Sequence, residues 1–177
     1  MKYAQGKQGR VYLLKFENND DFLEQIKAFI KKEKIKCAFF VFLGAVVKAK
    51  MAAGPKKPVN PPVPNMLQVK DGWEVFGTGS VFLNKKKEPQ VHIHGNFGKG
   101  EKSKMGCVRS DAKIFNVIEA MVTEITGVNV FKDIDTATGL NMMQINQRLG
   151  SPAARKPGSS DELFVKKNRK PFNCPKF

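Results

Sequence analysis

Three residues able to bind a metal ion lie within one short stretch of the sequence, "PQVHIHGNFGKGEKSKMGCV" (residues 89–108). The chain has two histidines, His92 and His94, and both are here; Cys107, one of three cysteines, follows thirteen residues later. Imidazole nitrogens and a thiolate suit zinc, and three protein ligands with an open fourth position are typical of catalytic or ligand-binding zinc sites. The stretch therefore predicts a mononuclear zinc site at these three residues.

The spacing of the three residues supports this prediction. Alternate side chains of a β-strand share one face, so His92 and His94 would point the same way, about 6–7 Å apart, while Val91 and Ile93 face a core. The glycine-rich segment 95–106 is expected to be a loop that doubles back and presents Cys107 beside the histidines. The alternative is that the histidines lie on an exposed strand and that the cysteine is a small buried hydrophobic residue.

Hydrophobic patterning predicts the elements that must position this stretch. A helix is expected at residues 18–34, where Phe22, Ile26, Phe29 and Ile30 fall on one helical face. The segment 110–127 fits a helix or a strand by periodicity alone. Strands are expected at residues 9–17 and 37–53, at 73–84 as one strand or as a bent pair with glycines at the bend, and in two short pieces after residue 128. Residues 54–66, with five prolines, are expected to form a loop.

The composition restricts the classes of protein to which the chain can belong. The longest apolar run, residues 37–47, is shorter than the ~20 residues of a transmembrane helix, and the N-terminal residues lack the apolar core of a signal peptide. Three dispersed cysteines do not form a disulfide framework. These features favour a cytoplasmic protein that does not enter a membrane.

The chain is strongly basic. It carries 31 Lys and Arg against 16 Asp and Glu, a net charge of +15, which favours an anionic partner such as nucleic acid; a surface that keeps the protein in solution is the alternative. From residue 150 the sequence is basic and rich in Pro and Ser, so residues 150–177 are predicted to be a tail outside a domain of residues 1–149. The candidate nucleic-acid contacts are Lys48, Lys50, Lys56 and Lys57, and in the tail Lys166, Lys167, Arg169 and Lys170.

Several segments in chain order resemble the PPC domain family (plants and prokaryotes conserved), which occurs alone in prokaryotes and beside AT-hook motifs in plant DNA-binding proteins. They are "FFVFLGAV", "GWEVFGTGSVFL", "PQVHIHGNF", "MGCV", "NVIEAMV" and "ATGLNMMQI", and they span roughly residues 11–145. His92 and His94 match the paired histidines of the family. The family's Gly-Gly-His triplet reads Met105-Gly106-Cys107 here, and Glu119 falls at an acidic position of the family.

The resemblance implies a fold and a set of possible functions. The fold would be α/β (α+β), a single domain with a largely antiparallel sheet flanked by helices, assembled as a homotrimer. A first hypothesis is a DNA-binding-type protein with a zinc site and contacts to nucleic acid that do not depend on sequence. The alternative is a metal-dependent enzyme or small-ligand-binding protein that uses the open zinc position, with Glu119 as the candidate catalytic residue and Glu74 as a further residue lining the site. A trimeric scaffold stabilised by its metal is the third hypothesis.

Overall fold

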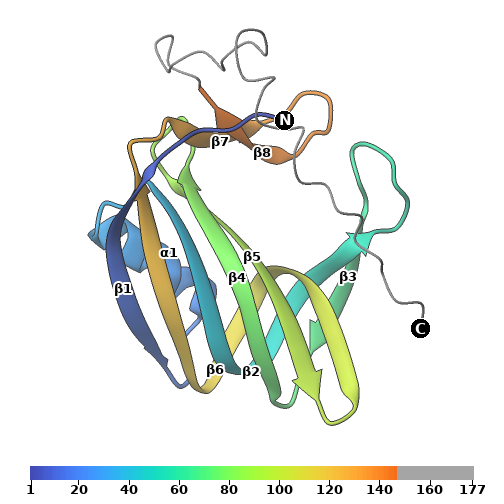
Figure 1. Ribbon diagram of the computed structural model, residues 1–177. Helices are drawn as coiled ribbons and strands as arrows, with labels where there is room; N and C mark the ends of the chain where they lie inside the picture. Colours follow the sequence, from blue (N-terminus) through green and yellow to red (C-terminus); the bar gives the residue numbers. More distant parts are fainter. Residues whose placement is uncertain (147–177) are drawn as a thin grey trace, which may run out of the picture. The chain divides into compact units, whose positions relative to one another are not determined.

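The structure, a computed structural model, describes residues 1–146, and in this part of the chain it contains eight strands and one helix (Figure 1). Their bounds are β1 (Lys7–Glu17), α1 (Phe22–Lys32), β2 (Cys37–Pro55), β3 (Pro64–Val69), β4 (Trp73–Leu83), β5 (Pro89–Lys99), β6 (Lys102–Thr126), β7 (Val130–Ile134) and β8 (Asn141–Ile145). No helix among these residues is long and apolar enough to cross a membrane. The predicted tail, with its four candidate nucleic-acid contacts, lies outside the described residues.

The strands form one strongly curved antiparallel sheet and a separate two-stranded sheet. The order of the large sheet is β1-β6-β5-β4-β2-β3, and β6 also pairs with β2. Strands β2, β4, β5 and β6 therefore pair in a closed circuit, while β7 and β8 pair with each other. The prediction of a largely antiparallel sheet is confirmed. A single helix accompanies the sheet within residues 1–146, where the family resemblance implied helices in the plural.

Strand β6 settles the ambiguity of residues 110–127, which are extended. The strand pairs with β5 near its start, with β2 over much of its length and with β1 near its end. Partner strands on both sides explain a sequence rich in Ile, Val and Phe. A central strand buries alternate side chains on the core side, and its backbone N–H and C=O groups form hydrogen bonds to both neighbours. Tertiary pairing, which periodicity cannot reveal, decides the conformation here.

The expected loop at residues 95–106 is wrong, because the segment is a tight β-hairpin. Strand β5 continues to Lys99, β6 begins at Lys102, and these two residues pair across a two-residue turn. Gly100 has φ +56°, a left-handed conformation that such turns need and that glycine adopts without steric cost. The hairpin register is therefore set by the turn.

Helix α1 is shorter than predicted and covers the inner face of the sheet. The Asp21 carboxylate caps its first turn and accepts hydrogen bonds from the backbone N–H groups of Leu23 and Glu24 at 3.1 and 3.2 Å, so the helix begins at Phe22 and not at Asn18. Its apolar face, with Phe22 and Ile26, is buried against the sheet.

Two glycines of β4 make room for this core. Of the two alternatives for this segment, the single strand is correct, because β4 runs unbroken from Trp73 to Leu83. The rings of Phe40 and Phe42, on the neighbouring strand, lie over Gly79 and Gly77, and a Cβ on Gly79 would stand 2.1 Å from the Phe40 ring. The glycines thus allow aromatic rings to pack closely on an unbroken strand.

We expect Gly79→Ala to lower the free energy of unfolding by about 1–3 kcal/mol, because the added methyl group overpacks the Phe40 ring. Urea denaturation measures the change. Gly98→Ala is the matched control on the neighbouring strand, since nothing lies within 4 Å of its added Cβ. Equal destabilisation by the two substitutions would contradict this role of Gly79.

Candidate metal centre

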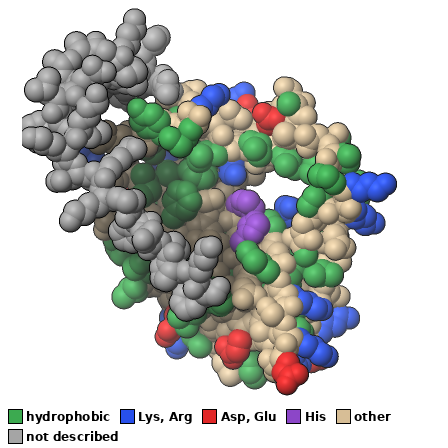
Figure 2. Space-filling model, turned by 45° about the vertical axis from the view of Figure 1, so that its right-hand side comes forward, with side chains coloured by type: hydrophobic (Ala, Val, Ile, Leu, Met, Phe, Trp, Pro, Cys, Tyr) green, Lys and Arg blue, Asp and Glu red, His purple; other side chains and the backbone are tan. Residues whose placement is uncertain are grey.

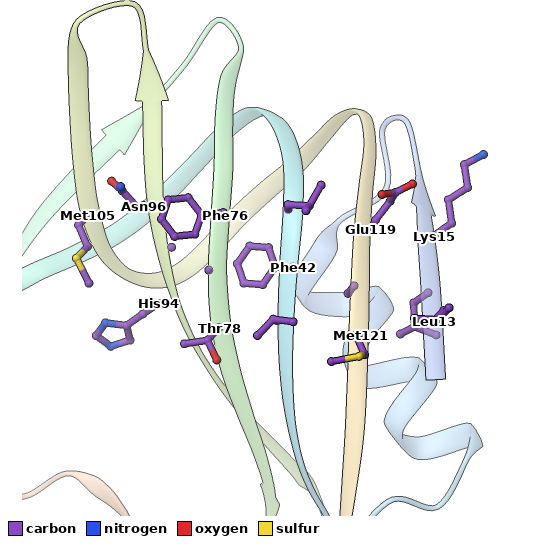
Figure 3. A pocket seen from close by; sticks show the side chains of 16 residues that line it. Leu13, Lys15, Phe42, Phe76, Thr78, His94, Asn96, Met105, Glu119 and Met121 are labelled. Carbon is purple, nitrogen blue, oxygen red and sulfur yellow. The ribbon is translucent and has the colours of Figure 1, made fainter. Parts of the chain in front are cut away.

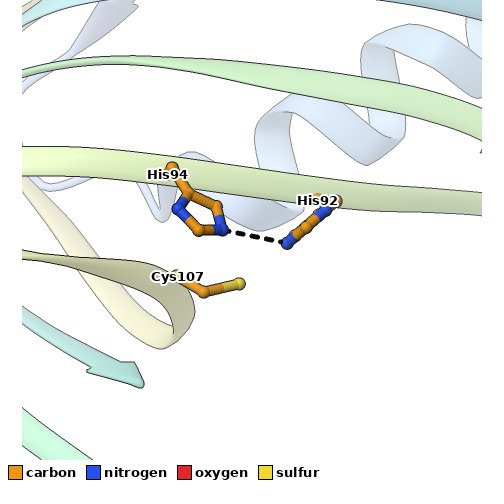
Figure 4. Close-up of side chains that lie close together, drawn as sticks. All are labelled: His92, His94 and Cys107. Carbon is orange, nitrogen blue, oxygen red and sulfur yellow. Dashed lines mark hydrogen bonds between the residues drawn. The ribbon is translucent and has the colours of Figure 1, made fainter. Parts of the chain in front are cut away.

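The three predicted ligands come together at the outer side of β5 and the start of β6 (Figure 4). His92 and His94 share one face of β5, and their Nε2 atoms are 3.2 Å apart. Counting five residues back from the hairpin turn along each strand gives His94 on β5 and Cys107 on β6, which are direct cross-strand partners. The donor atoms of all three residues lie within 4.8 Å of one another, so the register of one hairpin assembles the cluster.

The spacing of the donor atoms fits a metal ion. With zinc–nitrogen distances of about 2.0–2.1 Å and a zinc–sulfur distance of about 2.3 Å, donors of a tetrahedral site lie about 3.3–3.6 Å apart. The 3.2 Å between the two Nε2 atoms is close to this donor–donor distance. The donor atoms furthest apart in the cluster, within 4.8 Å, would have to approach each other slightly by side-chain rotation. Two neutral imidazoles could also share a hydrogen bond at 3.2 Å.

Burial differs across the cluster. The histidines are exposed, and Figure 2 shows them (purple) at the surface in a hollow bordered by hydrophobic side chains. Cys107 is buried, and burial raises the pKa of its thiol above the ordinary value. Burial also lowers the pKa of His92, helped by the positive charges of His94, Lys132 and Arg109. Both alternating core residues of β5, Val91 and Ile93, turn inward as predicted.

Sequence reasoning missed two cations beside the cluster. The positive charges of Lys132 and Arg109 add to the lowering of the pKa of His92, and they offset part of the effect of burial on Cys107, whose pKa stays raised. Arg109 lies where the β2–β6 pairing shifts register, since Lys50 pairs with Ser110 and Met51 with Val108. A bulge of this kind re-aims the side chain of the unpaired residue.

Lys132 lies on β7, a strand outside the large sheet, and packs beside Phe82 of β4. The side chain is 9% exposed, its ammonium lies 5.8 Å from the centre of the Phe82 ring, and burial lowers its pKa. A bridge from Asn84 to Lys132 and an ion pair at 2.6 Å between Lys85 and Asp133 hold β7 against the end of β4. The local sequence around Lys132, "VFKDI", does not indicate this position, because the neighbours of the side chain come from three other strands.

The two candidate acids lie apart from the cluster. Glu119 pairs with Leu43 on β2, and two strands, β2 and β4, separate it from His94 on β5, which corresponds to about 14 Å at ~4.8 Å per strand. Glu74 pairs with Gly98, four residues along the strands from the pair of Thr78 and His94. Neither carboxylate joins the three ligands within one protomer.

The outer face of the curved sheet is apolar and open to solvent (Figure 3). An open concavity of about 910 Å³ runs across it, with His94 and Met105 at one end and Glu119 and Lys15 at the other. Leu13, on the edge strand β1, is 84% exposed, and Phe76, on β4 inside the sheet, is 64% exposed; both values are high for large apolar side chains. Further exposed apolar side chains of this outer face are Val41, Leu43, Met105 and Met121.

The candidate nucleic-acid contacts within the described residues are all exposed. Lys48 and Lys50 lie on β2, and Lys56 and Lys57 lie in the segment between β2 and β3. The Lys50 ammonium forms an ion pair at 2.7 Å with Asp111, which neutralises part of its charge. The other three are free of ion pairs with residues 1–146.

Comparisons with known proteins agree with the fold. The family model of the Plants and Prokaryotes Conserved (PCC) domain matches residues 3–126. A metal-containing protein from Archaeoglobus fulgidus is 23% identical, with a TM-score of 0.72 over 81% of this chain and 99% of that chain. A plant- and prokaryote-conserved (PPC) protein from Pyrococcus horikoshii is 24% identical, with a TM-score of 0.71 over 83% of this chain and 99% of that chain.

A third similar structure is a candidate DNA-binding protein from Ralstonia eutropha, which is 17% identical, with a TM-score of 0.63 over 76% of this chain and 91% of that chain. No curated protein matches the sequence. At these identities the structures support the fold, while the match of the family model covers more than half of the chain.

Proposed function

The chain belongs to the Plants and Prokaryotes Conserved (PCC) domain family, and on this premise we propose that it is a zinc-binding protein whose protein ligands are His92, His94 and Cys107. The observation that carries the proposal is the convergence of three nitrogen and sulfur donors on one point. Two imidazoles and a thiolate are ligands that zinc favours over the harder cations. The metal-containing relative from Archaeoglobus fulgidus supports a metal in this fold.

Three protein ligands leave a fourth position for a small ligand, at which zinc would supply a Lewis acid when bound. Within residues 1–146 no carboxylate joins the cluster, so none of the described residues supplies a carboxylate as general base beside it. Binding of a small ligand is therefore the function that this geometry supports best. A metal-dependent enzyme would need its acid or base to come from a substrate, from a neighbouring protomer or from outside residues 1–146.

We expect about one zinc ion per chain in protein purified without an affinity tag, and its loss in His92→Ala and Cys107→Ala. Each substitution removes one of three ligands, and metal analysis by mass spectrometry measures the content. Glu119→Gln is the control, because its carboxylate lies two strands away from the site and its metal content should equal that of the wild type. Wild-type protein without metal, or full metal in Cys107→Ala, would contradict the proposed ligand set.

The same proposal includes a homotrimer that uses the outer apolar face of the sheet. An exposed apolar surface on the middle of a sheet is uncommon in monomers and typical of a subunit interface. The face is continuous over β1, β6, β2, β4 and β5, and its side chains are mainly Leu, Val, Phe and Met. Copies of this chain are the occupants that the family resemblance favours.

We expect the protein to sediment at three times the 19.8 kDa mass of one chain, and Val41→Asp to shift it towards the monomer. Val41 is 51% exposed and lies between Met121 and Thr78 at the middle of the outer face, so a charge there would be buried on assembly. Val59→Asp is the matched control, since Val59 is 55% exposed in the segment between β2 and β3. A monomeric wild type would overturn the assembly proposal.

A second candidate function is contact with nucleic acid that does not depend on sequence. The net charge of +15 supports it, as does the candidate DNA-binding relative from Ralstonia eutropha. Lys56 and Lys57 are exposed, lie side by side in the segment between β2 and β3 and have no ion pair within residues 1–146. Such lysines neutralise phosphates and release counterions, which makes affinity salt-dependent.

We expect duplex DNA to bind at low salt with an affinity that falls steeply as salt rises. The double substitution Lys56→Gln and Lys57→Gln should reduce the slope of log affinity against log salt concentration by about 2, or about one unit for each lost phosphate contact. Fluorescence anisotropy at several salt concentrations measures the slope. Lys31→Gln with Lys32→Gln, at the end of α1, is the control. Weak binding that does not change with salt would exclude this function.

A further inference from the structure

A second sulfur atom lies on the same face of the β5–β6 hairpin as the three candidate ligands. Met105 and Cys107 are two residues apart on β6, so their side chains share one face of the strand. Cys107 pairs with His94 and Met105 pairs with Asn96, which makes Met105 the diagonal neighbour of His94 across the hairpin. Diagonal neighbours lie about 7–8 Å apart, within reach of a long side chain. The hairpin therefore presents a thioether as well as a thiol on one face.

The side chain of Met105 is free to turn towards the cluster. It is 64% exposed, and together with His94 it lines the same end of the open concavity (Figure 3). A methionine side chain has three rotatable bonds and a polarisable sulfur. Rotation about these bonds can bring the Met105 sulfur towards the His94 imidazole while the strand backbone stays in place.

Both sulfur-containing residues depart from the family pattern in the same chemical direction. The Gly-Gly-His triplet of the family reads Met105-Gly106-Cys107 in this chain. One exchange adds a thioether, and the other replaces an imidazole with a thiol. With His92 and His94 unchanged, the donors become two imidazoles, one thiolate and one thioether, a softer set than three imidazoles.

The fourth donor distinguishes one metal from another. The protein ligands of zinc are thiolates, imidazoles and carboxylates, whereas soft thioethers favour copper(I). Two imidazoles and a thiolate in a trigonal arrangement, with a weak and long bond to a methionine sulfur, are the ligands of blue-copper sites. The 3.2 Å between the two Nε2 atoms and the limit of 4.8 Å for all three donors fit either metal. The Met105 thioether is the donor that favours copper.

From this arrangement we propose that the cluster is also a copper(I) site, in which His92, His94 and Cys107 bind the ion and Met105 is a weak fourth ligand. The inference rests on the ligand set of the proposed function and adds a second metal and one more ligand. With zinc the fourth position stays open for a small ligand, because a thioether is not among the usual ligands of zinc. With copper(I) the Met105 sulfur fills that position.

The test adds copper(I), as its acetonitrile complex in the absence of oxygen, to the full chain loaded with zinc. Metal analysis first establishes the zinc content of the sample, and a colorimetric zinc indicator then measures the released ion. We expect about one equivalent of copper(I) to release nearly all of the zinc, because a thiolate and a thioether together favour the softer ion.

Met105→Leu removes the sulfur and keeps an apolar side chain of similar size. We expect this variant to hold as much zinc as the wild type, while its affinity for copper(I), measured by competition with a copper(I) chelator, falls about tenfold, the lower end of what loss of an outer partner costs at metal sites. X-ray absorption at the copper edge should show two sulfur ligands in the wild type and one in Met105→Leu.

Met121→Leu is the matched control. Met121 is 43% exposed on the same outer face, but it pairs with Val41, and β2 and β4 lie between it and His94. Its affinities for zinc and for copper(I) should equal those of the wild type.

The outcomes separate this inference from the proposed function. Zinc that stays bound when copper(I) is added, or equal copper(I) affinity in the wild type and Met105→Leu, would overturn the four-ligand copper site and leave the zinc site standing. A wild type that binds neither ion would overturn both. Release of zinc by copper(I), with weaker copper binding in Met105→Leu alone, would support the copper site.

Discussion

The register of the β5–β6 hairpin is the constraint on which the candidate site depends. A two-residue turn with Gly100 in a left-handed conformation pairs Lys99 with Lys102, and every pair further from the turn follows from that one. His94 consequently faces Cys107. A shift of one residue would turn the alternate side chains of β5 to the other side, placing the histidines in the core and Ile93 outside.

Core packing on the opposite face of the strands stabilises this register. Ile93 and Phe97 of β5 are fully buried, and the neighbouring glycines of β4 admit the aromatic rings of β2. Slippage of the hairpin would therefore expose large apolar side chains as well as dismantle the cluster. The same packing that stabilises the sheet thus holds the candidate ligands His92, His94 and Cys107 at their spacing. Among the described residues, the imidazoles form a hydrogen bond only with each other.

The part of the site that sequence could predict is the part governed by local rules. Alternation along a strand puts His92 and His94 on one face, and a glycine-rich reversal brings Cys107 towards them, although the reversal is a tight turn and not the long loop expected. Pairing partners decide the rest. Residues 110–127 are a strand because β1 and β2 flank them, and Glu119 lies far from the histidines because β2 and β4 intervene. Lys132 was missed for the same reason.

The exchange of a histidine for Cys107 in the family triplet has an electrostatic consequence at this site. By resemblance the third ligand of the family is an imidazole, which is neutral when it binds a metal, whereas a thiolate carries one negative charge. Lys132 and Arg109 stand beside that position and stabilise the thiolate form, opposing the effect of burial on Cys107. The cations therefore suit a cysteine ligand, and a cysteine ligand makes the presence of two cations beside a metal ion less costly. If zinc binds as proposed, its site would combine the Cys107 thiolate with the positive charges of Lys132 and Arg109.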